Sequence, residues 1–165
     1  MSRSGYSDDC DDNWSWICWR GAVKSAIRGK RGQAFLRETL AALDALPERR
    51  LVSHDLIKLP KPVDPWDQRG LWLWDVETDL GNVCTLGAVG IARKIDMAAV
   101  DPEDHDSVAG LFNIPHALAC EIMFMNDEAH WRTSPEDRFN KMRDWISSEI
   151  RDHAHTSALP TKAIP

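Results

Sequence analysis

Cys84 is the residue that the sequence places best for nucleophilic chemistry. It lies in the segment 81–92, GNVCTLGAVGIA, where small and turn-forming residues are too dense for an ordinary surface helix. The pattern predicts a tight turn that leads into a closely packed helix. A thiol at a helix N-terminus has its thiolate stabilised by the helix dipole and by free backbone N–H groups. A thiol-dependent hydrolase or transferase is therefore one hypothesis for this chain.

That hypothesis needs a base, and the sequence does not identify one. His105, His116 and His130 follow Cys84, but none has the spacing of a papain-like or related enzyme. The Asn-Asp pair at 126–127 could orient an imidazole only if the fold brought these groups together. Cys84 fits better as a small side chain buried beside Leu86 and Ala88, as free cysteines usually are. We therefore expect no catalytic residue. If the chain is an enzyme after all, Cys84 is its candidate nucleophile.

Neither a metal site nor a phosphate loop is indicated by the spacing of the remaining residues. The four cysteines, at 10, 18, 84 and 120, form no CxxC pair and have no histidine in a recognised metal-ligand spacing. The glycines at 81, 87 and 90 fit neither GxGxxG nor GxxxxGK[ST]. We expect free thiols, no bound metal and no cofactor.

A helix-turn-helix pattern in 106–123 makes a DNA-binding regulator the second alternative. Its second helix, expected over 115–126, contains Glu121 and no Arg or Lys. Groove binding draws affinity from phosphate neutralisation and specificity largely from Arg, Lys, Asn and Gln. The formal net charge of −6 also opposes binding to nucleic acid. Direct nucleic-acid binding is therefore not expected.

Charged and aromatic groups are the remaining candidates for function. Five basic residues and no acid lie between 20 and 31, whereas eight acids and two basic residues lie between 75 and 106. Such runs usually form solvated helix ends, but they could also dock on a charged partner. Among the eight tryptophans, the one in the Pro-rich loop is the best exposed anchor. The candidate partner-binding residues are Arg28, Lys30, Arg31, Trp66, Asp101, Glu103, Asp104 and Asp106.

The elements that position these residues are mainly α-helical with a minor β component. At 165 residues, with 43% hydrophobic residues, the chain fits one domain with its own core, expected over 13–155. We expect a flexible acidic lead-in over 1–12, an exposed Pro-rich loop over 60–70 and a flexible tail over 156–165. Apolar periodicity predicts two helices before Pro47 and four more over 83–95, 102–112, 115–125 and 135–153. The segments 50–59 and 71–78 favour a small antiparallel β-hairpin.

The first two helices are expected to form an antiparallel hairpin that is the main scaffold. Asp101-Pro102 and Ser134-Pro135 read as N-cap and first-turn signals of later helices. The tryptophans at 14, 16 and 19 cannot all face inward, because these positions span more than one helix face. The expected core positions of the hairpin are Ile17, Ala26, Phe35, Leu36, Leu40 and Leu43.

Four strings carry a resemblance to a known family. They are 20–38 (RGAVKSAIRGKRGQAFLRE), 83–90 (VCTLGAVG), 125–128 (MNDE) and 133–139 (TSPEDRF). The chain resembles a family of small uncharacterised proteins of temperate phages and prophages that share a CxLGA segment and a later ND segment. The match covers about 1–150 and is weakest over 56–73. The family brings no established catalytic residues to transfer.

This resemblance implies a phage-type accessory protein made in the bacterial cytoplasm. The N-terminus lacks the apolar stretch of a secretory signal, and no apolar run approaches the ~20 residues of a membrane span. The leading hypothesis is a non-enzymatic protein that binds a host or defence protein complex, for example as an anti-CRISPR or similar inhibitor. A second copy of the chain is an alternative partner.

Overall fold

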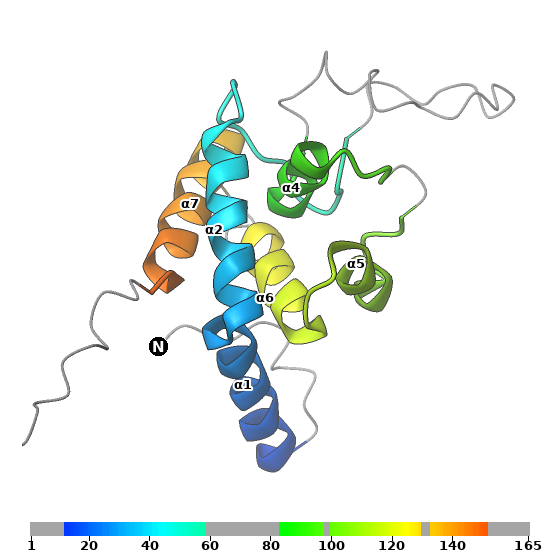
Figure 1. The fold of residues 1–165 in the computed structure, drawn as a ribbon, viewed down its shortest axis with the longest axis vertical. Helices are drawn as coiled ribbons and strands as arrows, with labels where there is room; N and C mark the ends of the chain where they lie inside the picture. The colour runs from blue at the N-terminus through cyan, green and yellow to red at the C-terminus, as the bar shows by residue number, and fades with distance from the viewer. Residues whose placement is uncertain (1–11, 59–82, 98–99, 130–132, 152–165) are drawn as a thin grey trace, which may run out of the picture.

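The fold of the chain is mainly α-helical. The computed structural model describes residues 12–58, 83–97, 100–129 and 133–151. Within these ranges lie six helices (Figure 1), namely α1 (Asn13–Arg28), α2 (Lys30–Asp44), α4 (Thr85–Arg93), α5 (His105–Phe112), α6 (His116–Asp127) and α7 (Pro135–Glu149). The expectation of a mainly helical fold is confirmed.

The first two helices run end to end, so the predicted antiparallel hairpin is wrong. Figure 1 shows α2 leading away from the end of α1 and not folding back along it. Gly29 alone separates them, with an extended ψ of 155°. A helical hairpin needs a loop of about two to five residues, and one residue produces only a bend. A Cβ at Gly32 would meet the backbone of Ala26, so this bend requires a glycine there.

The core forms around α2 and α6. Figure 1 shows α7 on one side of α2 and α4 on the other, and α6 packs against α1, α4, α5 and α7. Burying these apolar faces against one another removes them from water and stabilises the fold. The largest fully buried side chains include Leu36, Leu43, Phe112, Leu118, Ile122, Phe139, Met142 and Ile146.

Three of the six expected core positions in the first two helices are not fully buried. Phe35, Leu36 and Leu43 are buried as predicted, but Leu40 and Ala26 are only partly buried. Ile17 is 54% exposed, so its prediction is wrong. The apolar periodicity of α1 is real, but only its C-terminal part, with Val23 and Ile27 buried, meets the other helices.

The first predicted strand, 50–59, is not a strand in its described part. Residues 50–58 are irregular, and Ile57 forms one isolated antiparallel bridge with Val83. The backbone of this segment forms isolated hydrogen bonds and no strand ladder, for example from Val52 N–H to Val83 O and from Cys84 N–H to Leu56 O. The second predicted strand, 71–78, and the loop 60–70 lie outside the described residues.

Polar caps fix where the later helices begin. Ser134 caps α7 as predicted, because its hydroxyl accepts the N–H of Asp137. The predicted cap at Asp101 is wrong: α5 begins at His105, and the carboxylate of Asp104 accepts the N–H of Ser107. Asp101 instead accepts the N–H of Glu103, two residues on, which is the local turn that aspartate favours.

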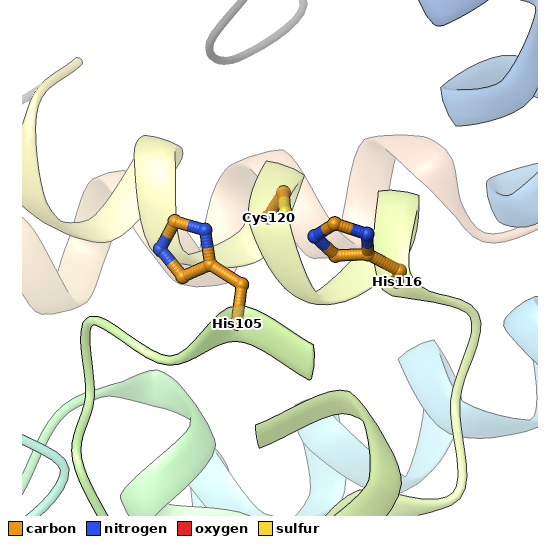
Figure 2. Close-up of side chains that lie close together, drawn as sticks. All are labelled: His105, His116 and Cys120. Carbon is orange, nitrogen blue, oxygen red and sulfur yellow. The ribbon is translucent and has the colours of Figure 1, made fainter. Parts of the chain in front are cut away.

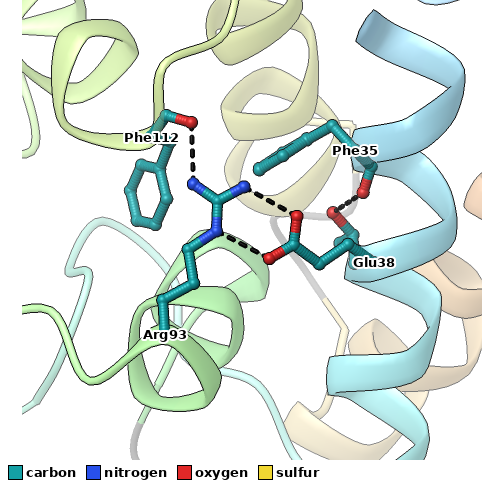
Figure 3. Close-up of polar contacts among 5 residues, drawn as sticks. Phe35, Glu38, Arg93 and Phe112 are labelled. Carbon is teal, nitrogen blue, oxygen red and sulfur yellow. Dashed lines mark hydrogen bonds and ion pairs between the residues drawn. The ribbon is translucent and has the colours of Figure 1, made fainter.

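Arg93 joins three of the helices through a bidentate ion pair and a hydrogen bond to a backbone carbonyl (Figure 3). Arg93, at the end of α4, donates to both carboxylate oxygens of Glu38 in α2, at 2.6 Å each. It also donates to the carbonyl of Phe112 at the end of α5 and lies over the ring of Phe35. The hydrogen bond from Arg93 lowers the pKa of the Glu38 carboxyl. One side chain thus ties α4 to both α2 and α5.

Among the described residues, no single helix is long and apolar enough to cross a membrane. The pair α5 and α6 reaches that length only together, and it is bent by 109°.

Candidate functional site

The N-terminal half of α1 exposes large apolar side chains to solvent. Trp14 is 73% exposed, Ile17 54% and Trp16 38%. Figure 1 shows this half of α1 extending beyond the other helices, which explains the exposure. Trp19, one turn further on, is partly buried and packs against the core. The prediction that the three tryptophans cannot all face inward is confirmed.

Basic side chains lie beside these apolar groups. The guanidinium of Arg20 stacks over the Trp16 ring at 4.5 Å from its centroid, a cation–π arrangement. From 13 to 37 the chain carries six basic residues and no acid, although its overall charge is −6. An open groove of about 400 Å³ runs along α1. It is lined by Trp16, Ile17, Arg20, Gly21, Val23, Lys24, Ile27, Arg28, Glu121 and Glu149.

We call the set Trp14, Trp16, Ile17, Arg20, Lys24 and Arg28 the α1 surface. It combines exposed aromatic area with cations on adjoining turns of one helix. Such a surface can bury its aromatic rings in a partner while its cations attract an acidic rim. Of the residues predicted from sequence to bind a partner, Arg28 belongs to it.

The other predicted basic residues lie just beyond this surface. Lys30 and Arg31 are both exposed at the start of α2. Arg31 donates a hydrogen bond to the side chain of Asn113, which caps the C-terminal end of α5. Arg31 therefore has a structural contact besides any role in binding.

The predicted acidic residues gather at the start of α5, where three of them have local partners. Asp101, Glu103, Asp104 and Asp106 are all exposed. Asp101 accepts a backbone N–H, Asp104 caps α5, and Asp106 lies 3.4 Å from a ring nitrogen of His116. Hydrogen bonds from Ser107 lower the pKa of Asp104, so its carboxylate is charged at neutral pH. The predicted anchor Trp66 lies outside the described residues.

Cys84 occupies a helix N-terminus and its thiol is buried, both as predicted. It is the N-cap of α4, and its Sγ accepts the N–H of Gly87 at 3.3 Å. Burial, with the nearby negative charge of Asp127, raises the pKa of the Cys84 thiol to about 12. A nucleophile has to be a thiolate that the substrate can reach. This environment therefore opposes the thiol-enzyme alternative.

Two of the four segments that carry the resemblance, 83–90 and 125–128, meet around Cys84. The side-chain oxygen of Asn126 accepts hydrogen bonds from the N–H and the hydroxyl of Thr85, and its amide donates to Val52 O and to Asp127. Asp127 also accepts the N–H of His54. The adjoining cavity, of about 10 Å³, has room for about one water. These residues hold the irregular segment 51–57 in place, and the cavity that the described residues form here is too small for a substrate.

The helix-turn-helix pattern corresponds to α5 and α6, but α6 is a core helix. Ten of its twelve residues are buried, including Glu121 and Asn126. A recognition helix must lie on the surface to enter a DNA groove. The burial of α6 therefore opposes the DNA-binding alternative.

A cluster that the sequence reasoning missed lies between α5 and α6. One donor atom from each of His105, His116 and Cys120 lies within 4.8 Å of the other two (Figure 2). The signal was present in the sequence, because His116 and Cys120 are four residues apart and therefore share one helix face. His105 is eleven residues before His116, and only the bend between α5 and α6 brings it close.

Comparison with family models, with curated proteins and with solved structures finds no match to this chain.

Proposed function

We propose that this protein is a non-enzymatic, phage-type accessory protein that binds an acidic surface of a host or defence protein complex through the α1 surface. The observation that carries the proposal is the exposure of Trp14, Trp16 and Ile17 beside Arg20, Lys24 and Arg28. An anti-CRISPR or similar inhibitor that works in the bacterial cytoplasm is one form of this function. The resemblance to temperate-phage proteins supports it.

The physical reason is that exposed aromatic area is costly unless another surface covers it. Trp and Arg are enriched among the residues that dominate protein interfaces. Arg20 already stacks on Trp16, so a partner would meet a partly ordered pair and lose less side-chain entropy on binding. The cations of α1 would speed association with an acidic partner and make it sensitive to salt.

A protein partner is favoured over nucleic acid by the charges around the groove. The carboxylate of Glu149 lines it together with the cations of α1, and it would repel a phosphate backbone. Ile17 offers apolar area that suits a side-chain pocket better than base stacking. The net charge of −6 adds a general repulsion toward nucleic acid.

The test is affinity capture from a nuclease-treated bacterial lysate with the full chain and two α1 variants. One variant carries Trp14→Ser and Ile17→Ser, and the other carries Arg20→Glu and Lys24→Glu. Lys58→Glu with Lys141→Glu is the matched control, because both lysines are exposed outside α1. We expect one acidic protein to be captured by the wild type and the control, and to be lost with both α1 variants. Recovery with the wild type should fall as salt is raised.

Three other results would redirect the proposal. If neutralising Asp101, Glu103, Asp104 and Asp106 abolished capture and the α1 variants did not, the acidic residues would be the binding site, acting as a phosphate mimic. If capture were lost on nuclease treatment, the partner would be nucleic acid. Self-association of the purified chain that the α1 variants abolish would identify a second copy as the partner.

A further inference from the structure

We propose that His105, His116 and Cys120 form a binding site for one transition-metal ion, best suited to Zn²⁺. The three donor atoms lie within 4.8 Å of one another. Figure 2 shows a nitrogen of each imidazole turned toward the space beside the Cys120 side chain. The site is distinct from the α1 surface, and the inference does not depend on the proposed function.

The donor set selects the class of metal. Two imidazole nitrogens and one thiolate suit zinc, cobalt or copper, whereas magnesium and calcium prefer oxygen ligands. Zn–N bonds of about 2.0–2.1 Å and Zn–S bonds of about 2.3 Å place tetrahedral donor atoms roughly 3.3–3.8 Å apart. The donor atoms, which lie within 4.8 Å of one another, therefore have to approach by about 1 Å when a metal ion binds.

The helix geometry makes this convergence a property of the backbone. His105 is the first residue of α5, His116 is the first residue of α6, and Cys120 is one turn further along α6. The bend of 109° between the two helices places both starting turns on the same side. A metal ion there would fasten α5 to the core helix α6.

The surroundings complete the pattern of a metal site. The Nδ1 atom of His116 lies 3.4 Å from a carboxylate oxygen of Asp106, which leaves its Nε2 for the metal. Metal-bound histidines commonly donate the N–H of their second ring nitrogen to a nearby carboxylate. Cys120 is buried and His116 is exposed, so the site has a protected thiol and an open entry. Three protein donors leave a fourth position for water or another ligand.

Binding has a defined proton balance. The neutral thiol of Cys120 loses its proton to solvent and binds as a thiolate, while the two imidazoles bind in their neutral form. Burial and the charge of Asp106 raise the pKa of that thiol to about 12 without a metal, and a divalent cation reverses the local charge. No oxidation or reduction is involved.

Cobalt spectroscopy of the reduced, metal-free full chain tests the site directly. Titration with Co²⁺ should produce one equivalent of a tetrahedral spectrum with a thiolate-to-cobalt charge-transfer band, and Zn²⁺ should displace it. Cys120→Ser should remove the charge-transfer band. Cys84→Ser and Cys18→Ser are the matched controls and should retain it, because neither thiol belongs to the cluster. Asp106→Asn should keep the band but weaken zinc binding by about 10–100-fold, as expected for an outer partner.

Two further variants keep the test valid if Cys120→Ser does not fold. His105→Asn and His116→Asn retain the thiol, and each should lower the affinity for zinc and the rise in Tm that excess zinc gives the wild type. The proposal is overturned if the folded wild type shows no charge-transfer band with Co²⁺. It is also overturned if the band survives in Cys120→Ser, or if neither histidine variant lowers the affinity.

Discussion

The helices α1 and α6 are both rich in apolar side chains, yet the fold uses them in opposite ways. Only two of the sixteen residues of α1, Val23 and Ile27, are buried, and its tryptophans at 14 and 16 lie in solvent. Ten of the twelve residues of α6 are buried, and they include Glu121, Asn126 and Asp127. Apolar content alone therefore does not identify the core helix of this protein.

Position in the fold explains the difference. Four helices pack around α6, whereas the N-terminal half of α1 extends past its neighbours (Figure 1). Polar groups in α6 are buried because they have partners, as Asn126 does with Thr85 and Val52. Apolar groups on α1 are exposed because no described segment covers them. The first arrangement stabilises the fold, and the second leaves exposed the surface that we propose for binding.

The largest effect on stability is expected in α6. Leu118→Ala removes a fully buried side chain and should lower the free energy of unfolding by about 2–5 kcal/mol. Chemical denaturation monitored by circular dichroism measures this. A change below about 0.5 kcal/mol, typical of surface positions, would show that α6 is not the core helix.

A smaller loss of unfolding free energy is expected when the buried polar network around Asn126 is disrupted. Asn126→Ala removes the acceptor for Thr85 and the donor to Val52 O, leaving buried groups unsatisfied at a cost of about 1–3 kcal/mol each. Because neighbouring groups rearrange, we expect a total of roughly 2–3 kcal/mol by denaturation. A neutral result would mean that water replaces the amide and that the network does not hold segment 51–57.

The ion pair between Glu38 and Arg93 should contribute less to the free energy of unfolding than the Asn126 network, because it is partly exposed. Arg93→Met should cost at most about 1 kcal/mol at neutral pH. The folded pKa of Glu38 is lowered, so its contribution is present above the unfolded pKa and is lost as pH falls through the folded value. The difference in Tm between variant and wild type should therefore shrink in acid, and a constant difference would contradict this assignment.

The smallest effect on stability is expected on α1. Ile17→Ala and Trp14→Ser should each change the free energy of unfolding by less than about 0.5 kcal/mol. The measurement is the same denaturation assay used for Leu118→Ala. A loss of about 2 kcal/mol or more, the lower end of the range for buried positions, would place these side chains in the core and remove the basis of the proposed function.

Local signals in the sequence predicted much of the fold. The helices after residue 83 were predicted within a few residues, and Ser134-Pro135 marked the start of α7. The hairpin of α1 and α2 was mispredicted because Gly29 signals only that a helix ends. The same glycine fits a bend between two helices and an antiparallel connection, and these differ only in the length of the loop. The segment 50–58 has strand-forming residues, but in the structure its backbone bonds singly to Val83, Cys84 and Pro135, which no local pattern encodes.

The candidate sites were predicted only in part. Basic residues near the end of α1 were predicted as binding residues. The exposure of Ile17 was not predicted, because periodicity shows which residues share a helix face and does not show whether another segment covers that face. Cys84 was placed at a helix start, and its burial raised its pKa against the expected dipole effect. The cluster of His105 with His116 and Cys120 depends on the bend between α5 and α6, which lies beyond local sequence signals.

Site-specific photocrosslinking tests the central claim, that the α1 surface is the binding surface, most directly. A photoreactive amino acid replaces Ile17 in the full chain in bacterial cells, and Asn140, exposed on α7, carries the same replacement as the control. The account predicts a covalent adduct with one acidic protein from position 17 and none with that protein from position 140. An adduct formed equally from both positions, or none from position 17, would contradict it.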